Sequence, residues 1–138
     1  MASIPSDMKA FNRSVVAEYR AAGRHFTGRM EGRSVLILTT RGRVSGEPRE
    51  VVLGYGREDD RFVVIASNNG APGAPAWYRN LQADPEVTVE IEGDRFEAHA
   101  STISDQERER YAELVPWLEQ QQGLTERRIP LVALDRVG

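Results

Sequence analysis

The chain has 138 residues, the length of one domain, and its lack of cysteine excludes disulfides, thiol nucleophiles and iron–sulfur clusters and fits a reducing cytoplasm. It has no apolar run near the roughly 20 residues of a membrane-spanning helix, its polar N-terminus does not resemble a signal peptide, and its two histidines do not indicate a metal site. Residues 1–57 hold ten Lys and Arg against five Asp and Glu, and residues 58–138 hold eight against sixteen, so the basic half favours a small anionic ligand and the acidic remainder argues against nucleic acid.

The chain begins with a predicted helix over residues 6–24, in which apolar residues recur at near-helical spacing. Ser6 is a candidate N-cap, and Gly23 is placed to end the helix. Because this part is basic, a peripheral contact with an anionic membrane surface is one use for it. We expect a single domain in which residues 1–29 form an N-terminal helix and residues 30–138 form the cofactor-binding part.

Apolar and β-branched residues predict three strands, at residues 34–40, 50–56 and 62–67. A turn over 41–49 and a charged hairpin loop over 56–61 separate them. The third strand is nearly all apolar, which predicts burial on both of its faces. The connections are too short for the crossovers of a parallel sheet, so we expect antiparallel pairing.

The second half of the chain alternates helices and strands. The predicted elements are a short helix at 76–84, strands 87–93 and 95–103 in a hairpin around Gly93-Asp94, a helix at about 105–121 and a last strand at 131–135. Ser104 and Glu107 form a candidate capping box, and Pro116 disturbs the later part of that helix. Six or so short antiparallel strands with helical cover predict a mainly β barrel of the α+β class.

The segment RGRVSGEPR, residues 41–49, concentrates three arginines, a serine and two glycines between two predicted strands. Guanidinium groups make charge-assisted hydrogen bonds to phosphates and carboxylates, and glycine lets backbone amides approach an anion. The segment is therefore a candidate anion site. The alternative is a solvated turn in an arginine-rich protein, in which Lys9 is the only lysine.

Two further segments are placed to border a flat ligand. ASNNG, residues 66–70, follows the buried strand, and Ser67 and the asparagines have donors for ring carbonyls; the alternative is an ordinary strand exit. In the predicted short helix, Trp77 is either a stacking wall or a core residue. Asn80 near the same face needs hydrogen-bond partners if it is semi-buried.

These segments occur together and in order in LILTTRGRVSGEPREVVLGYG and FVVIASNNGAPGAPAWYRNLQADPEVTVEI. The combination resembles the deazaflavin-dependent nitroreductase family, which includes proteins similar to F420H2-dependent quinone reductases, and the likeness covers roughly residues 30–135. The resemblance implies a split β-barrel of the FMN-binding, pyridoxamine-phosphate-oxidase-like kind that uses coenzyme F420.

The resemblance also implies a site. The turn would hold the phosphate and oligoglutamate tail, the next strand would line the ribityl chain and ring, the Ala-Ser-Asn segment would border the reactive ring edge, and the Trp-Tyr-x-Asn helix would close the pocket. In that order the implied cofactor-binding residues are Arg43, Val44, Ser45 and Arg49; Glu50, Val51, Val52, Leu53 and Gly54; Ile65, Ala66, Ser67 and Asn68; and Ala76, Trp77, Tyr78, Arg79 and Asn80. Ser67 is the candidate catalytic residue, as a hydrogen-bond donor to the acceptor.

The sequence departs from the family pattern at several positions. Many relatives have a lysine where Val44 stands and another basic residue near Gly73, and Arg41 is a candidate replacement for one of them. Relatives often have proline at the position of Val52. The segment 116–130 holds one Trp and no Tyr, whereas relatives that reduce nitro drugs have several tyrosines there. The resemblance therefore does not extend to nitroreduction.

The first functional hypothesis is an oxidoreductase that passes a hydride from reduced F420 to a quinone, an enone or a similar small electrophile. One alternative is a protein that carries a deazaflavin, flavin or lipid without catalysis. Another is an FMN-dependent oxidoreductase of the same fold. Fold analogy also suggests a homodimer.

Overall fold

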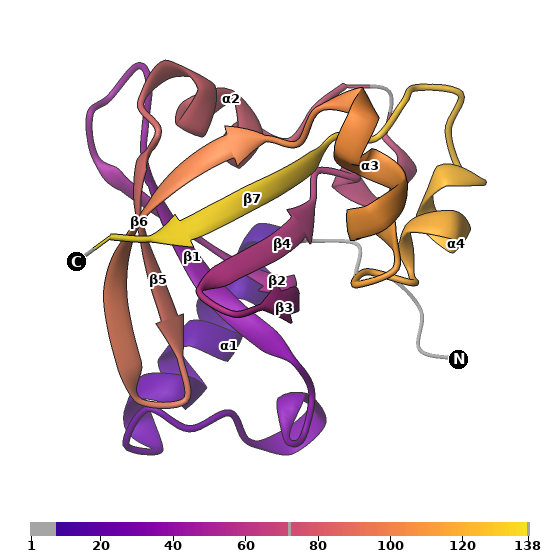
Figure 1. Cartoon of the computed structure of the whole chain (residues 1–138). Coiled ribbons are helices and arrows are strands. Elements are labelled where there is room, and N and C mark those ends of the chain that lie inside the picture. Colours follow the sequence, from indigo (N-terminus) through magenta and orange to yellow (C-terminus); the bar gives the residue numbers. More distant parts are fainter. Residues whose placement is uncertain (1–7, 72, 138) are drawn as a thin grey trace.

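The computed structural model describes residues 8–71 and 73–137, and it contains one curled sheet with helices around it (Figure 1). Its strands are β1 (Val35–Arg41), β2 (Pro48–Gly54), β3 (Gly56–Glu58), β4 (Arg61–Ile65), β5 (Glu86–Ile91), β6 (Asp94–Thr102) and β7 (Leu131–Arg136). They pair in the order β2-β1-β5-β6-β7-β4-β3, and every pairing in the described part of the chain is antiparallel. The predicted mainly β, antiparallel architecture is confirmed.

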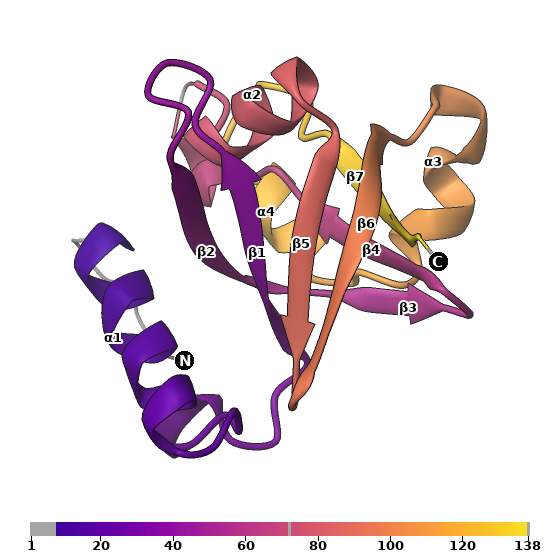
Figure 2. The same cartoon turned by 90° about the vertical axis from the view of Figure 1, so that its left-hand side faces the viewer.

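The sheet curls because consecutive strands form its two edges. β2 and β3 are separated only by Tyr55, yet they stand first and last in the strand order. Figure 2 shows β2 turning at its lower end into β3, which runs beneath the other strands. The amide of Tyr55 donates to the carbonyl of Ser34 at 3.1 Å. The predicted strand over 50–56 is thus corrected to two strands with a bend, and part of the predicted loop over 56–61 is strand β3.

In the residues that the structure describes, four helices and two 3₁₀ turns accompany the sheet. They are α1 (Met8–Ala21), η1 (Gly28–Met30), η2 (Asn68–Gly70), α2 (Ala76–Ala83), α3 (Asp105–Ala112) and α4 (Leu118–Gln122). In Figures 1 and 2, α1 lies beside β2, α2 sits at one end of the barrel, and α3 and α4 lie away from α1. The expected division at residues 29 and 30 falls inside η1 and stays a prediction.

Two helix predictions need correction. The helix predicted over 6–24 ends at Ala21, and its candidate cap Ser6 lies outside the described residues. The helix predicted over 105–121 is two helices, because Pro116 lacks the amide hydrogen that a continuous helix requires. Ser104 does stand at the N-cap of α3, but its side chain makes no capping hydrogen bond, so the capping box is not formed.

Alternation along the strands divides the apolar side chains between the barrel interior and two outer layers. Leu36 and Leu38 point into the interior, whereas Ile37 between them packs against buried residues of α1. Val63 and Ile65 likewise point outward, to the layer formed with α3 and α4. The predicted burial of the third strand on both faces is therefore confirmed. Each fully buried side chain of this kind contributes about 1.5–3 kcal/mol to folding.

The hairpin of β5 and β6 turns one residue earlier than predicted. Ile91 pairs with Asp94, so the two turn residues are Glu92 and Gly93, with φ of 40° and 85°. Positive φ at both positions belongs to the turn type that matches the twist of a hairpin. The hydroxyl of Tyr19 accepts a hydrogen bond from the Gly93 amide at 3.0 Å, which fastens α1 to this turn.

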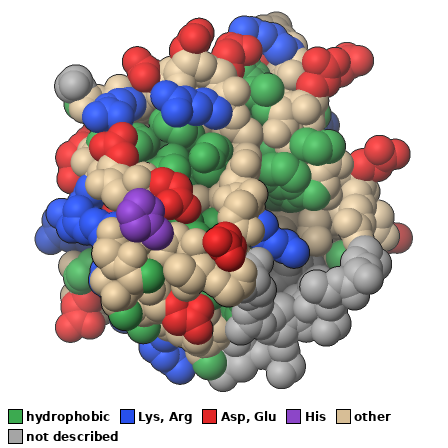
Figure 3. Space-filling model, turned by 90° about the horizontal axis from the view of Figure 1, so that it is seen from below, with side chains coloured by type: hydrophobic (Ala, Val, Ile, Leu, Met, Phe, Trp, Pro, Cys, Tyr) green, Lys and Arg blue, Asp and Glu red, His purple; other side chains and the backbone are tan. Residues whose placement is uncertain are grey.

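The surface carries charges of both signs. Seen from below, apolar side chains gather near the middle of the face with charged ones around them (Figure 3). Exposed ion pairs such as Arg136–Asp94, at 3.0 Å, join the neighbouring strands β6 and β7, and each such pair contributes less than about 1 kcal/mol. No helix in the described part of the chain is long and apolar enough to cross a membrane.

Candidate active site

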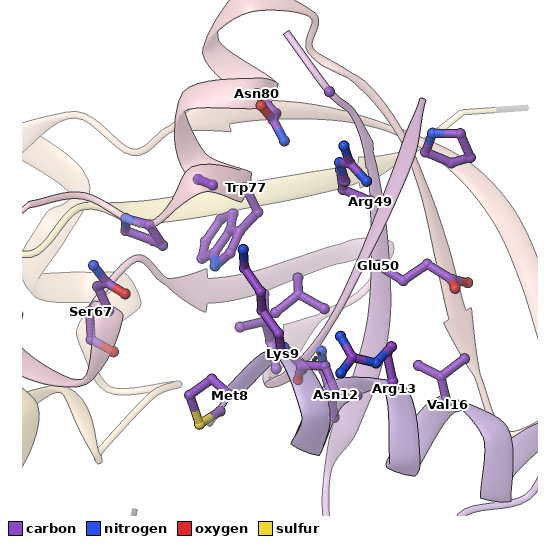
Figure 4. Close-up of a pocket in the computed structure, with 18 of the residues that line it drawn as sticks. Met8, Lys9, Asn12, Arg13, Val16, Arg49, Glu50, Ser67, Trp77 and Asn80 are labelled. Atoms are coloured by element: carbon purple, nitrogen blue, oxygen red, sulfur yellow. Dashed lines mark hydrogen bonds between the residues drawn. The ribbon is translucent and has the colours of Figure 1, made fainter. Parts of the chain in front are cut away.

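A cavity of about 1220 Å³ lies between α1, the edge strand β2 and the start of α2. The turn before β2, the loop after β4 and the C-terminal helical segment complete its wall. Figure 4 shows Lys9 rising from α1 toward Trp77, with Arg49 and Asn80 on the side of α2 and Ser67 across the cavity. The site is therefore assembled from segments far apart in the sequence.

Asn80 joins the arginine-rich turn to α2. Its Oδ1 accepts hydrogen bonds from the backbone amide of Arg43 at 3.2 Å and from Nη1 of Arg43 at 3.0 Å. Its Nδ2 donates to Oγ1 of Thr40 at 3.1 Å. Asn80 is 3% exposed, so these bonds satisfy an amide that has little access to water. They hold the turn and the helix as one wall of the cavity.

The turn is compact because it has glycine where a side chain would not fit. A Cβ atom at Gly42 would lie 2.8 Å from Oγ of Ser45 and 3.1 Å from the carbonyl oxygen of Glu47. Gly46 has a φ of 74°, which favours glycine. Nη2 of Arg49 donates to Oγ of Ser45 at 3.3 Å, and both residues line the cavity.

Positive charge dominates the lining. The basic lining residues are Lys9, Arg13, Arg20, Arg43 and Arg49, and Glu50 is the only acidic one among the residues that the structure describes. Glu50 is already bound by Arg20, and this hydrogen bond raises the pKa of Arg20. Among residues 8–71 and 73–137, the other four cations have no ion-pair partner. A cavity with this excess of unpaired cations fits an anionic ligand.

Two tryptophans also line the cavity. Trp77 is 7% exposed and packs in the barrel core while its ring also lines the cavity. Trp117 lies against Gly54, where a Cβ would be 3.4 Å from the indole Cζ2. Oε1 of Gln121, beside them in the lining, is buried and has no hydrogen-bond partner. An orphaned acceptor in the wall fits a ligand that carries a hydrogen-bond donor.

Arg127 positions the loop that carries Ser67. Its Nη2 donates to the carbonyl oxygens of Ala66 at 3.3 Å and of Ser67 at 3.0 Å. Ser67 lines the cavity as predicted. Asn68 also lines it, but its Nδ2 donates to the carbonyl of Gly73 at 2.9 Å. This amide therefore holds its own loop, where the sequence suggested a donor to the ligand.

The cavity brings together most of the residues that the resemblance implied. Those that line it are Arg43, Val44, Ser45, Arg49, Glu50, Val51, Val52, Leu53, Gly54, Ile65, Ser67, Asn68, Ala76, Trp77 and Asn80. Ala66, Tyr78 and Arg79 do not. Ala66 is fully buried in the core, Arg79 is exposed, and the hydroxyl of Tyr78 shares a hydrogen bond with Oγ1 of Thr102 at 2.8 Å. Successive residues of a helix point about 100° apart, so Trp77, Tyr78 and Arg79 cannot all face one cavity.

The contribution of α1 to the site was not predicted from the sequence. Lys9, Asn12, Arg13 and Val16 line the cavity at helical spacing. The signal that could have indicated it was the spacing of Lys9 and Arg13, which are four residues apart with Asn12 beside them. The predicted helix that carries them was interpreted as helical cover for the barrel or as a membrane contact. Arg41, the candidate replacement for the absent lysine, is exposed and does not line the cavity.

Comparisons with known proteins agree on one family. The family model described as F420H(2)-dependent quinone reductase matches residues 11–136. A Mycobacterium tuberculosis protein named F420H(2)-dependent quinone reductase is 33% identical over 109 residues, which are 73% of this chain and 72% of that protein.

Solved structures agree on the fold. The structure of an F420-H2 dependent reductase matches with a TM-score of 0.66 and 30% identity, over 75% of this chain and 95% of that one. A structure described as a domain-swapped dimer matches with a TM-score of 0.69 and 27% identity, over 89% of this chain and 96% of that one. The predicted split β-barrel is confirmed by this likeness.

Proposed function

We propose that this chain, which belongs to the F420H(2)-dependent quinone reductase family, transfers a hydride from F420H2 to a quinone or a related conjugated electrophile. The observation that carries the proposal is the cavity, whose lining combines unpaired cations on the turn and on α1 with the aromatic side chains of Trp77 and Trp117. This combination suits an elongated ligand with an anionic end and a flat ring. The same family membership makes F420 the expected cofactor.

Residues on the turn would hold the anionic end of F420. Arg43, Ser45 and Arg49 line the cavity there, and each charge-assisted hydrogen bond contributes about 1.5–3 kcal/mol. Trp77 and the strand residues of β2 offer an apolar surface for the ring. When bound, reduced F420 supplies the hydride.

The chain itself contributes position and polarity. Trp77, Trp117 and the apolar residues of β2 line the cavity and would pack against the ring of the cofactor. Ser67 is proposed as the hydrogen-bond donor to the acceptor oxygen on which negative charge develops, which lowers the barrier to transfer. Arg127 fixes the backbone of Ser67 and is a positioning residue.

A titration tests the proposal. Purified protein is titrated with F420 and, separately, with FMN, and binding is followed by cofactor fluorescence; oxidation of F420H2 by a soluble quinone is then measured. The Arg43→Ala/Arg49→Ala variant should bind F420 at least about tenfold more weakly. The control Arg33→Ala/Arg128→Ala removes the same charge from exposed residues outside the lining and should bind normally.

The outcomes separate the alternatives. F420 binding without quinone reduction would support the carrier alternative. Binding of FMN alone would support a flavin enzyme of the same fold. If neither compound binds, or if the control variant loses as much affinity as the turn variant, the cofactor proposal is wrong.

A further inference from the structure

We infer that α1 forms a second anion-binding wall of the cavity, in which Lys9 and Arg13 bind the distal carboxylates of an extended polyanionic ligand. The inference rests on the proposed function, for which that ligand is F420 with its glutamate tail. It assigns to α1 a direct part in cofactor binding.

Lys9 and Arg13 stand one helical turn apart on the face of α1 that lines the cavity. Asn12 and Val16 belong to the same face. Figure 4 shows the Lys9 side chain extending from the helix into the space below Trp77. Both cations are therefore presented to the cavity by a regular element and not by a loop.

No group within the described residues explains these two cations. Neither has an ion-pair or hydrogen-bond partner there. Arg20, about two turns beyond Arg13 on the same helix, is by contrast bound to Glu50 and lies 3.4 Å from Glu90. Cations on neighbouring turns of one helix repel each other when no anion compensates them, and this repulsion destabilises the ligand-free helix. An anionic ligand removes that repulsion.

The two walls together indicate how many anionic groups the ligand carries. Arg43 and Arg49 enter the cavity from the turn before β2. Lys9 and Arg13 enter it from α1, which packs against β2. A ligand with one anionic group needs only the turn. A chain of anionic groups is the ligand class that uses both walls.

The second wall also explains what the turn lacks. Val44, in the middle of the turn, is 93% exposed and carries no charge. Arg41, at the start of the turn, does not line the cavity. Lys9 and Arg13 add two positive charges to the cavity from a different element.

α1 is fixed firmly enough to serve as a wall. Val15, Val16 and Tyr19 are at most 5% exposed and pack against Ile37. Oδ1 of Asn12 accepts a hydrogen bond from the backbone amide of Val52 at 3.2 Å. The helix is thereby attached to the strand that forms the cavity floor.

Three forms of the cofactor test the inference: F420 with several glutamates, the form that has the phosphate without glutamates, and the form that ends at the ribityl chain. Binding is measured by cofactor fluorescence at low and high salt. The Lys9→Ala/Arg13→Ala variant should bind the glutamate-bearing form about tenfold or more weakly than the wild type does. Its affinities for the other two forms should stay within about twofold of the wild-type values. It should also reduce the salt dependence of binding.

Other results would overturn it. If the variant loses the same affinity for all three forms, Lys9 and Arg13 only position α1. If it loses affinity for none of them, the glutamate tail does not reach Lys9 and Arg13. Arg43→Ala/Arg49→Ala should by contrast weaken both phosphate-bearing forms, and Arg33→Ala/Arg128→Ala should change none. The melting temperature of the ligand-free Lys9→Ala/Arg13→Ala variant should equal or exceed that of the wild type, which shows that α1 remains docked. Failure of the wild type to bind any form would instead refute the proposed function.

Discussion

Asn80 is a single side chain on which the shape of the anion-binding turn depends. It accepts two hydrogen bonds from Arg43 and donates one to Thr40 while almost fully buried. The need for partners was visible in the sequence, since a polar residue stood near the apolar face of a short helix. The identity of these partners could not be predicted, because Thr40 and Arg43 lie about forty residues earlier in the chain and approach Asn80 only in the folded barrel.

Replacing this residue should loosen the turn. Asn80→Ala removes three hydrogen bonds and should lower the free energy of unfolding by about 2–4 kcal/mol, together with the affinity for F420. Thr40→Val keeps both Arg43 contacts of Asn80 and loses only the hydrogen bond from Nδ2 of Asn80 to Thr40, so its affinity loss should be smaller. Urea denaturation and the fluorescence titration measure the two effects. Equal affinity loss in both variants would show that the Arg43 contact does not order the turn.

At the scale of elements, α1 covers the exposed edge of the sheet. β2 is an edge strand, and edge strands have backbone groups that no neighbouring strand satisfies. Asn12 accepts the Val52 amide, and Arg20 binds Glu50 further along the same strand. One helix thus satisfies an edge strand and supplies cations to the cavity.

Hydrogen exchange tests the attachment of this helix. Asn12→Ala should make the Val52 amide exchange faster and should cost about 1 kcal/mol of stability. The Gly93 amide, which Tyr19 of the same helix holds, should exchange at its wild-type rate. Faster exchange at both amides would show that the whole helix detaches when Asn12 is lost.

The elements that could be predicted from sequence were those with local signals. Runs of apolar and β-branched residues identified the strands around Leu36 and Val64, and Pro116 predicted the disturbance of the late helix. The bend at Tyr55 was missed because the run before it is continuous in apolar character, and only the Ser34 carbonyl and the far edge of the sheet impose it. The approach of Trp117 to Gly54 joins segments about sixty residues apart, which no local pattern encodes.

At the scale of the whole molecule, closure of the barrel depends on tight contact between β3 and the segment after α3. A Cβ at Gly56 would lie 2.2 Å from the carbonyl oxygen of Leu114. That contact is impossible without moving backbone on one side. Gly73, by contrast, has room, since the nearest atom to its Cβ would be the far end of the Arg79 side chain at 3.4 Å.

Gly56→Ala should therefore destabilise the entire fold. We expect a loss of about 3 kcal/mol or more in the free energy of unfolding, as for other severe overpacking. Gly73→Ala is the matched control and should change stability by less than about 0.5 kcal/mol. Chemical denaturation followed by tryptophan fluorescence measures both. A mild effect at Gly56 would mean that β3 is free to move away from Leu114.

The bent strand that forms both edges of the sheet has a thermodynamic consequence. β2 supplies much of the cavity floor, and it can do so only while β3, one residue beyond its end, remains paired with β4 on the far edge. A partly opened barrel therefore has no intact site, and ligand binds the closed molecule alone. Each tenfold rise in ligand above its dissociation constant then adds about 1.4 kcal/mol to the work of opening the barrel. Cellular cofactor concentration would in this way set the lifetime of the folded protein as well as its occupancy.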